Sequence, residues 1–331
     1  MSIGIIGAGG WGTALAVLLC RKHDDVSLWC HSAETLARIR ETGENAAYLP
    51  SVKLPDRLQV TGSLETAASG RELLLCVTPS HFLREVMTRA AAFVTTETIV
   101  CCGSKGIEES TLMTMGDVLA DVLGNSRRHA FLSGPTFALE VAQGLPAAVT
   151  AASAEPAVAR KVQQSVGSPE CRVYTSTDVV GVQLGGVIKN VIAIAAGVSD
   201  GLELGHNARA ALITRGLAEM TRLAVKMGAD PMTLSGLPGL GDLVLTCTGH
   251  LSRNRNLGFQ LGQGRRLADI VAGTRMVAEG VRNTRTVHLL AQRHGVEMPI
   301  VEQMYGVLYE DKDPMQAVRD LMRRTQKAEA D

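Results

Sequence analysis

A glycine-rich segment near the N-terminus has the residue types that bind a pyrophosphate. It fits the pattern G-x-G-x-x-G and consists of Gly7, Ala8, Gly9, Gly10, Trp11 and Gly12. The segment lies between an apolar run and a helical pattern, which is the context in which this pattern binds a dinucleotide. Gly7 would allow a tight turn, Gly9 the close approach of a pyrophosphate, and Gly12 the packing of helix on strand. We therefore predict a dinucleotide site; the alternative is a structural glycine turn.

The next apolar run, residues 26–30, bears on the choice of dinucleotide. An acidic residue about 20 positions after the glycines binds the ribose 2′-hydroxyl of NAD. Here the run ends with Cys30, His31 and Ser32, so no carboxylate would repel a 2′-phosphate. His31 would donate to that phosphate or lie against the adenine, which favours NADP(H) or the use of both cofactors. An exposed loop histidine is the other interpretation.

Lys189 and Asn190 interrupt the apolar stretch 179–198. Burying an ammonium group costs several kcal/mol unless a partner offsets the cost or the pKa falls. Such a lysine either extends to water or serves a cleft, and the residues leave both interpretations open. In a nicotinamide enzyme, a lysine of lowered pKa can protonate a carbonyl oxygen while hydride arrives at the carbon.

A glycine-dense segment, residues 236–243, is followed by polar residues that suit a phosphorylated polyol. We expect a loop between helices that carries Asp242, Thr246, Ser252, Arg253 and Asn254. If the loop is buried, these residues supply a carboxylate acceptor, hydroxyl and amide donors and a guanidinium group. The alternative is a surface loop with solvated arginines.

Two shorter segments follow apolar runs in the first half of the chain. Lys105 comes after the run 98–102 and would meet an anionic group. Gly134 and Thr136 come after the run 129–133, and we expect Pro135 just inside a new helix. The carboxyl ends of parallel strands bind ligands in open α/β sheets, although each segment alone is also typical of a plain strand-to-helix turn.

The secondary structure that the sequence predicts around these residues changes along the chain. Up to about Val173, short apolar runs alternate with helical patterns, which predicts a parallel sheet covered on both faces. After about Asp178, long segments with helical periodicity replace the runs. We therefore predict an α/β protein with an N-terminal Rossmann-like, doubly wound sheet in an NAD(P)-binding domain, 1–178, and an all-helical substrate and catalytic domain, 179–331.

Composition narrows the classes of partner and compartment. The 331 residues include 33 basic and 33 acidic ones, so no overall basic field would attract nucleic acid. The seven cysteines show no zinc-ligand spacing, which predicts no metal. Most of them lie inside apolar runs, where free cysteine is typical of a reducing compartment, so we expect the cytoplasm. The uncharged start, 1–20, contains five glycines and lacks a basic n-region. We expect no membrane span.

Eight motifs in order over residues 4–281 resemble one family. They are GAGGWGTALA, CVTPSH, GSKGIE, LSGPTFA, GGVIKNVIAIAAG, GLPGLGDLVLTCT, SRNRNLG and MVAEGV. The chain resembles the NAD(P)-dependent glycerol-3-phosphate dehydrogenase family of bacterial type over essentially its whole length. The resemblance implies reversible reduction of dihydroxyacetone phosphate to sn-glycerol 3-phosphate, a step that feeds glycerophospholipid synthesis, by a homodimer.

The resemblance also implies roles for individual residues. Lys189 would donate and accept the proton, and Asp242 would hold Lys189 or a substrate hydroxyl. Lys105 would lie between substrate and cofactor. The substrate phosphate would contact Arg253 and Asn254, with Ser252, Gly134 and Thr136 lining the same pocket. Besides the glycine turn, the cofactor contacts would be Trp11, His31, Lys105, Ala138, Arg253, Val277 and Glu279. For Val277 and Glu279 the residues alone provide no signal.

Two other functions fit parts of the pattern. A β-hydroxyacid dehydrogenase of similar two-domain build also carries lysine and asparagine on its first long helix, but its substrate bears a carboxylate. The segments GLPGLGDL and SRNR argue against it. A non-catalytic NAD(P)H sensor is the remote alternative, and the presence of both Lys189 and Asp242 argues against that class.

Overall fold

The strands of the computed structural model, which describes residues 1–124, 128–273, 278–326 and 328–329, form one eight-stranded sheet. Its order is β3-β2-β1-β4-β5-β6-β7-β8. The strands are β1 (Ser2–Ile6), β2 (Asp25–Trp29), β3 (Gln59–Thr61), β4 (Leu73–Cys76), β5 (Ile99–Cys102), β6 (Arg128–Ser133), β7 (Ala147–Ala152) and β8 (Cys171–Ser176). All neighbours pair in parallel except β6 and β7, which are antiparallel. The predicted N-terminal doubly wound sheet is confirmed.

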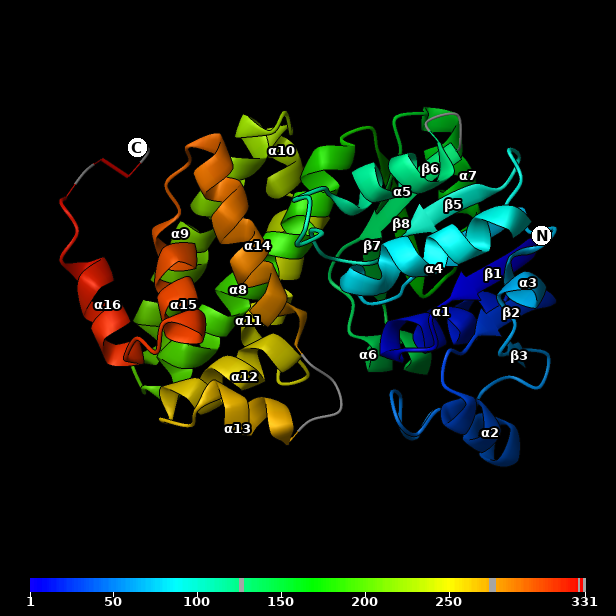
Figure 1. Ribbon diagram of the computed structural model, residues 1–331, viewed down its shortest axis with the longest axis horizontal. Helices are drawn as coiled ribbons and strands as arrows, with labels where there is room; N and C mark the ends of the chain where they lie inside the picture. Colours follow the sequence, from blue (N-terminus) through cyan, green and yellow to red (C-terminus); the bar gives the residue numbers. More distant parts are fainter. Residues whose placement is uncertain (125–127, 274–277, 327, 330–331) are drawn as a thin grey trace.

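Helices cover both faces of this sheet (Figure 1). One face packs on α1 (Gly10–Cys20), α6 (Ala138–Gln143) and α7 (Pro156–Val166), and the other on α3 (Leu64–Ala68), α4 (Leu83–Ala90) and α5 (Met115–Leu123). In β4, Leu73 and Leu75 face the first core, whereas Leu74 and Cys76 face the second. Strands buried on both faces explain the continuous apolar runs. The short α2 (Ala33–Thr42) has one buried residue, Ile39.

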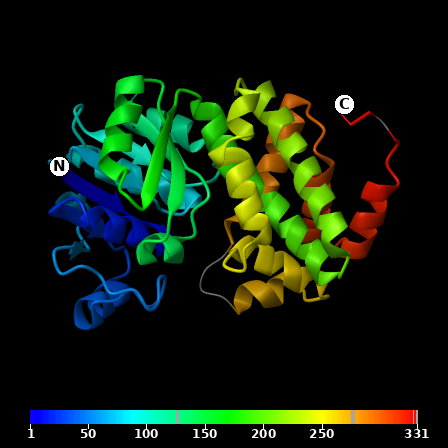
Figure 2. The ribbon, with the colours of Figure 1, turned by 180° about the vertical axis from the view of Figure 1, so that it is seen from behind.

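The second half of the chain is helical and is arranged around α8 (Val179–Gly201), as Figure 2 shows from behind. The other helices are α9 (Gly205–Lys226), α10 (Pro231–Leu234), a π-helix (Leu237–Gly241), α11 (Asp242–Thr248), α12 (Arg253–Gly262), α13 (Leu267–Ala272), α14 (Glu279–His294), α15 (Pro299–Tyr309) and α16 (Pro314–Met322). The predicted helical C-terminal region is confirmed. β8 ends at Ser176 and α8 begins at Val179, and the division into domains 1–178 and 179–331 stays a prediction.

The helix α8 is apolar because it is the centre of a core. By length and composition alone it could cross a membrane, but 83% of its apolar window is buried inside the protein. It packs against α9, α11, α12 and α14. A helix that is hydrophobic all round is typical of a span or of a buried core, and the packing shows that α8 is a core helix.

Glycines let α8 and α12 approach backbone to backbone. A Cβ added to Gly258 of α12 would overlap the Ile194 carbonyl oxygen of α8, and one added to Gly197 would overlap the Arg255 carbonyl oxygen. This contact places the first turn of α12, with Arg253 and Asn254, beside α8. Because the facing atoms are backbone, the contact has little freedom to relax.

We expect Gly258→Ala to destabilise the protein by about 2 kcal/mol, because the added methyl group forces two helices apart. Gly273→Ala is the matched control, since its Cβ would lie 3.6 Å from the nearest described atom, the Asp269 carbonyl oxygen. Urea unfolding followed by circular dichroism measures both variants. Equal midpoints for Gly258→Ala and the wild type would show that the helix contact is not tight.

Candidate active site

The glycine-rich turn between β1 and α1 has the geometry that a pyrophosphate needs. Gly7 has φ of 120°, a conformation that side chains rarely adopt. A Cβ on Gly12 would overlap the Gly7 carbonyl oxygen, whereas one on Gly9 would have no described atom within 4 Å. Gly9 is the N-cap residue of α1 and, as a glycine, provides no side-chain hydrogen bond to the first turn of the helix. The open approach to Gly9 and the free N–H groups of the helix therefore fit a dinucleotide phosphate.

Other residues predicted to contact the cofactor lie near this turn. A Cβ on Gly10 would lie 3.8 Å from the Ala138 Cβ, and one on Gly103 would lie 3.2 Å from the Trp11 Nε1. His31 follows β2, is exposed, and lies with its ring centroid 5.6 Å from that of Trp29. The structure brings Ala138 and Trp11 to the turn and leaves the His31 ring open to solvent.

Lys189 is held by a buried carboxylate and a hydroxyl. Its Nζ donates to Asp242 Oδ1 at 2.8 Å and to Thr246 Oγ1 at 2.7 Å. Lys189 is 7% exposed and Asp242 2%. Thr246 in turn donates to the Asp242 carbonyl oxygen at 2.6 Å, one turn back along α11. Lys189 therefore does not extend to bulk water, which argues against the first of the two interpretations of this lysine.

A second lysine shares the same carboxylate. Lys105, in the segment after β5, donates from Nζ to Asp242 Oδ2 at 2.6 Å. Its side chain is 22% exposed. Asp242 thus joins the end of the sheet to α8 and α11, and two ammonium groups lie on opposite oxygens of one carboxylate. The proximity of Lys105 to Lys189 was not predicted from the residues.

Burial and mutual charge set the protonation of this cluster. Burial lowers the pKa of Lys189 to about 8; the Asp242 carboxylate opposes this shift, and the Lys105 ammonium adds to it. Burial acts to raise the pKa of Asp242, but the Lys105 and Lys189 ammonium groups outweigh burial and hold that pKa below its usual value. Lys189 can therefore exchange a proton near neutral pH while Asp242 stays ionised.

The segment expected to be a polar loop is helical, so that prediction is wrong. Residues 237–248 form the π-helix and α11, and α12 starts at Arg253. Pro238 suits the first turn of a helix, and Ser252 caps α12 because its Oγ accepts from the Arg255 N–H at 3.2 Å. A Cβ on Gly185 would lie 3.0 Å from the Pro238 carbonyl carbon, so the segment packs closely on α8.

An amide relay links α8, α12 and α14. Asn254 Nδ2 donates to Asn190 Oδ1 at 2.9 Å, and Asn254 Oδ1 accepts from the Gly280 N–H at 3.0 Å. Arg253, beside Asn254, is exposed and makes no hydrogen bond or ion pair with the described part of the chain. The relay fixes the start of α12, and the Arg253 guanidinium remains available for an anion.

The turn after β6 differs in one respect from its prediction. Pro135 does not lie inside a helix, because α6 begins at Ala138. Pro135 packs instead on Gly241, where an added Cβ would lie 3.5 Å from the Pro135 Cγ. Gly134 has φ of 149°, and its carbonyl oxygen accepts from Thr136 Oγ1 at 3.3 Å. The turn therefore approaches the start of α11, where Asp242 lies.

Glu279, the first residue of α14, faces the end of β4. Its Oε1 accepts from the Ser80 N–H at 3.3 Å, and its buried Oε2 has no hydrogen-bond partner among the described residues. Burial raises the pKa of Glu279 to about 7, although the Ser80 N–H and the Arg253 charge oppose this shift. Val277, the other residue implied only by resemblance, lies outside the described residues.

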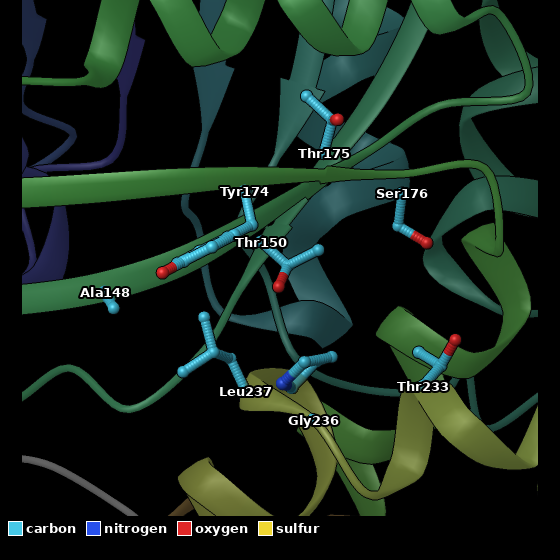
Figure 3. Close-up of a pocket in the computed structure, with 9 residues that line it drawn as sticks. Ala148, Thr150, Tyr174, Thr175, Ser176, Thr233, Gly236 and Leu237 are labelled. Atoms are coloured by element: carbon cyan, nitrogen blue, oxygen red, sulfur yellow. The ribbon is translucent and has the colours of Figure 1, made fainter.

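A separate groove of about 390 Å³ lies between the sheet edge and the helical half (Figure 3). Tyr174 of β8 and Thr150 of β7 point towards Leu237 and Gly236 across it. None of the predicted site residues lines this groove. The candidate active site is therefore the cluster around Asp242 together with the glycine turn.

Comparisons with known proteins match both halves of the chain to one family. A family model described as NAD-dependent glycerol-3-phosphate dehydrogenase N-terminus matches residues 2–159, and the corresponding C-terminus model matches 178–319. A glycerol-3-phosphate dehydrogenase [NAD(P)+] of Geobacter sulfurreducens is 56% identical over 329 residues, 99% of this chain and 98% of the relative. One from Koribacter versatilis is 51% identical over 97% of each chain.

A solved structure extends the likeness to three dimensions. The crystal structure of glycerol-3-phosphate dehydrogenase from Coxiella burnetii superposes with a TM-score of 0.94 at 43% identity, covering 98% of this chain and 99% of that one. D-mandelate dehydrogenase, with a TM-score of 0.67 at 14% identity, shares the fold alone. The matches over both halves of the chain favour the predicted family over the two alternatives. This chain therefore belongs to the NAD-dependent glycerol-3-phosphate dehydrogenase family of oxidoreductases.

Proposed function

We propose that this protein reduces dihydroxyacetone phosphate reversibly to sn-glycerol 3-phosphate, which would supply glycerophospholipid synthesis. The observation that most supports this proposal is the buried Lys189, whose Nζ bonds to Asp242 and Thr246. Asp242 also bonds to Lys105, which follows β5 at the end of the sheet. The relatives named glycerol-3-phosphate dehydrogenase [NAD(P)+] support the substrate and the cofactor. Oxidation of NADPH or NADH by the purified protein, dependent on dihydroxyacetone phosphate, tests the proposal.

Lys189 is the proton donor in the proposed mechanism. A nicotinamide cofactor held at the glycine turn would supply the hydride for the C2 carbonyl carbon. Lys189 gives one proton from Nζ to the carbonyl oxygen, so that the ketone becomes a secondary alcohol and the lysine becomes a neutral amine. Asp242 orients Nζ and stays ionised throughout, while Thr246 fixes the second Nζ hydrogen bond. In the oxidation direction the neutral amine accepts the hydroxyl proton.

The substrate phosphate binds, in this proposal, at the first turn of α12. The Arg253 guanidinium is exposed and free of described partners, and Asn254 is held by Asn190 and Gly280. A guanidinium group suits a phosphate because it donates two parallel hydrogen bonds. The other residues that we assign to the substrate are Lys105, Gly134, Thr136 and Ser252. Holding the phosphate would orient C2 towards Lys189.

The cofactor binds, in this proposal, along the glycine turn with a preference for NADPH. The pyrophosphate would contact Gly7, Gly9, Gly10 and Gly12, and the other assigned contacts are Trp11, His31, Lys105, Ala138, Arg253 and Glu279. The exposed His31 ring follows β2 in the place where an acidic residue would repel a 2′-phosphate. Glu279 Oε2 is buried and has no hydrogen-bond partner among the described residues, so it is available to accept a hydrogen bond from the cofactor.

We also propose a homodimer in the cytoplasm. The family likeness supports the dimer. All seven cysteines are buried free thiols, which is typical of proteins in a reducing compartment. Sedimentation of the purified protein tests the oligomeric state.

We expect Lys189→Met to lower kcat by about 10² to 10⁴, because it removes the proton donor and keeps the side-chain volume. NADPH affinity, measured by fluorescence titration, should change little because the glycine turn is untouched. Lys161→Met, at an exposed lysine of α7, is the matched control for loss of a charge. Retained turnover by Lys189→Met would overturn the assignment of the proton donor.

The two reaction directions should depend on pH with opposite signs. The pKa of Lys189 is about 8, so the ammonium needed for reduction is lost as the pH rises through 8. The neutral amine needed for oxidation of sn-glycerol 3-phosphate appears over the same range. We therefore expect kcat/KM for reduction to fall as the pH rises above about 8, and that for oxidation to rise with pH up to about 8 and then to level off.

Glu279, with a pKa of about 7, also titrates near this range. Glu279→Gln removes that group, so a midpoint near 8 should remain in this variant. Profiles that are flat between pH 6 and 10 in both directions would contradict the role of Lys189.

We expect His31→Asp to lower the ratio of kcat/KM for NADPH to that for NADH by about tenfold or more, because a carboxylate repels the 2′-phosphate and accepts from a 2′-hydroxyl. Initial rates with each cofactor at saturating dihydroxyacetone phosphate measure the ratio. A wild type that prefers NADH, with no response to the substitution, would show that His31 does not select the cofactor.

A further inference from the structure

One buried amide contacts the backbones of both segments that carry the active-site lysines. Asn283, on α14, is 1% exposed. Its Nδ2 donates to the Lys105 carbonyl oxygen at 3.3 Å and to the Val187 carbonyl oxygen at 3.4 Å. Val187 lies on α8 two residues before Lys189. The mechanism above uses neither of these hydrogen bonds, and Asn283 lies outside the motifs of the sequence analysis.

The segment that follows β5 has little regular structure before α5, and Ser104 Oγ, which donates to the Thr78 carbonyl oxygen at 2.6 Å, holds its first residues. Among the described residues, this segment contains one isolated β-bridge, between Ile107 and Thr114. On the outside, Glu109 pairs with Arg285 at 3.0 Å, but both side chains are about half exposed. Ion pairs of this kind contribute little to stability. From α14, Asn283 provides a buried contact to the backbone of Lys105 itself.

The two hydrogen bonds act on a charge arrangement that depends on distance. Lys105 and Lys189 lie on opposite oxygens of Asp242. Their separation sets both the repulsion between the ammonium groups and the share of the carboxylate that each receives. A displacement of the Lys105 backbone would change both interactions, even though Asn283 contacts neither ammonium group.

We propose that Asn283 is a positioning residue, which holds the Lys105 segment against α8 so that both lysines share Asp242. This inference rests on the proposed function for its kinetic consequence. Asn283 lies one turn after Glu279, so α14 brings the predicted cofactor contact and this positioning contact to the same site.

Loss of the Asn283 hydrogen bonds should shift the pKa of Lys189 in one direction. The groups that act on the charge of Lys189 are Asp242 and Cys247 of α11, Lys105 after β5, and Glu279 of α14. The Lys105 charge lowers the pKa of Lys189. If Lys105 moves away, its repulsion falls and Lys189 receives more of the Asp242 carboxylate. Both changes raise the pKa of Lys189.

The test compares Asn283→Ala and Asn283→Leu with Thr286→Val. The leucine variant keeps the branched shape of the asparagine side chain without its hydrogen bonds, so it avoids the cavity that alanine would leave. Thr286 is a matched control, since it is 1% exposed on the same helix and, within the described residues, its hydroxyl donates to the Arg282 and Asn283 carbonyl oxygens of α14. Kinetics over pH 6 to 10 and hydrogen exchange of residues 103–108 are measured for each protein.

We expect both Asn283 variants to lower kcat/KM for dihydroxyacetone phosphate about tenfold or more. The pH midpoint assigned to Lys189 should rise by about half a unit or more. Thr286→Val should change kcat/KM by less than about twofold and leave the midpoint unchanged. A merely structural role for Asn283 would lower the stability without moving the midpoint, and that result would overturn the proposal.

Hydrogen exchange separates this inference from the proposed function. We expect the amides of residues 103–108 to exchange about tenfold faster in the Asn283 variants than in the wild type or Thr286→Val. A wild type that does not turn over dihydroxyacetone phosphate would refute the proposed function, and the exchange data would then decide the positioning role. Unchanged exchange in both Asn283 variants would overturn it.

Discussion

The candidate active site depends on a single buried carboxylate that accepts hydrogen bonds from two ammonium groups. Asp242 is 2% exposed and accepts from Lys189 and Lys105 on separate oxygens. With both lysines protonated, this cluster carries one excess positive charge in a region of low dielectric. Two changes relieve that excess: Lys189 releases a proton, or an anion binds nearby. The first makes Lys189 an acid near neutral pH, and the second suits a phosphorylated substrate of the kind proposed here.

The helical half provides the rigid support that this charge arrangement needs. Lys189 lies on α8, which is almost entirely buried, and glycines allow α12 to contact α8 through its backbone. The amide relay from Asn190 through Asn254 to Gly280 then connects α8, α12 and α14 within the core. Polar groups in such a core are stable because each has a partner of fixed geometry. The proposed phosphate site at Arg253 is thereby held at a constant position relative to Lys189.

Much of the fold could be predicted from the sequence, because continuous apolar runs and helical periodicity are local signals. The strands β3 and β8 were not among the predicted runs, since β3 has three residues and β8 alternates buried with exposed positions in part. The residues 237–248 were expected to form a loop, because glycine is typical of turns and its use in close helix packing depends on neighbours distant in sequence.

Lys189 could be singled out because its charge contrasts with the apolar residues around it. Its link to Lys105 through Asp242 could not, because 137 positions separate Lys105 from Asp242. Asn283 resembles an ordinary polar residue of an amphipathic helix, although its place on the buried face with Val287 and Leu290 is a signal that could have identified it.

The ion pair between Lys105 and Asp242 also has a consequence for the order in which the protein folds. Lys105 belongs to the first half of the chain, whereas Asp242 and Lys189 belong to the second. Contacts between residues far apart in sequence form only after the loop between them has closed. During synthesis Lys105 emerges before its partner Asp242, whereas Lys189 and Asp242 both belong to the second half, so their pair includes no residue of the first half. The complete cluster therefore forms late, when the two halves pack together. Enzyme activity should accordingly appear only with the finished tertiary structure, after the helices and strands have formed.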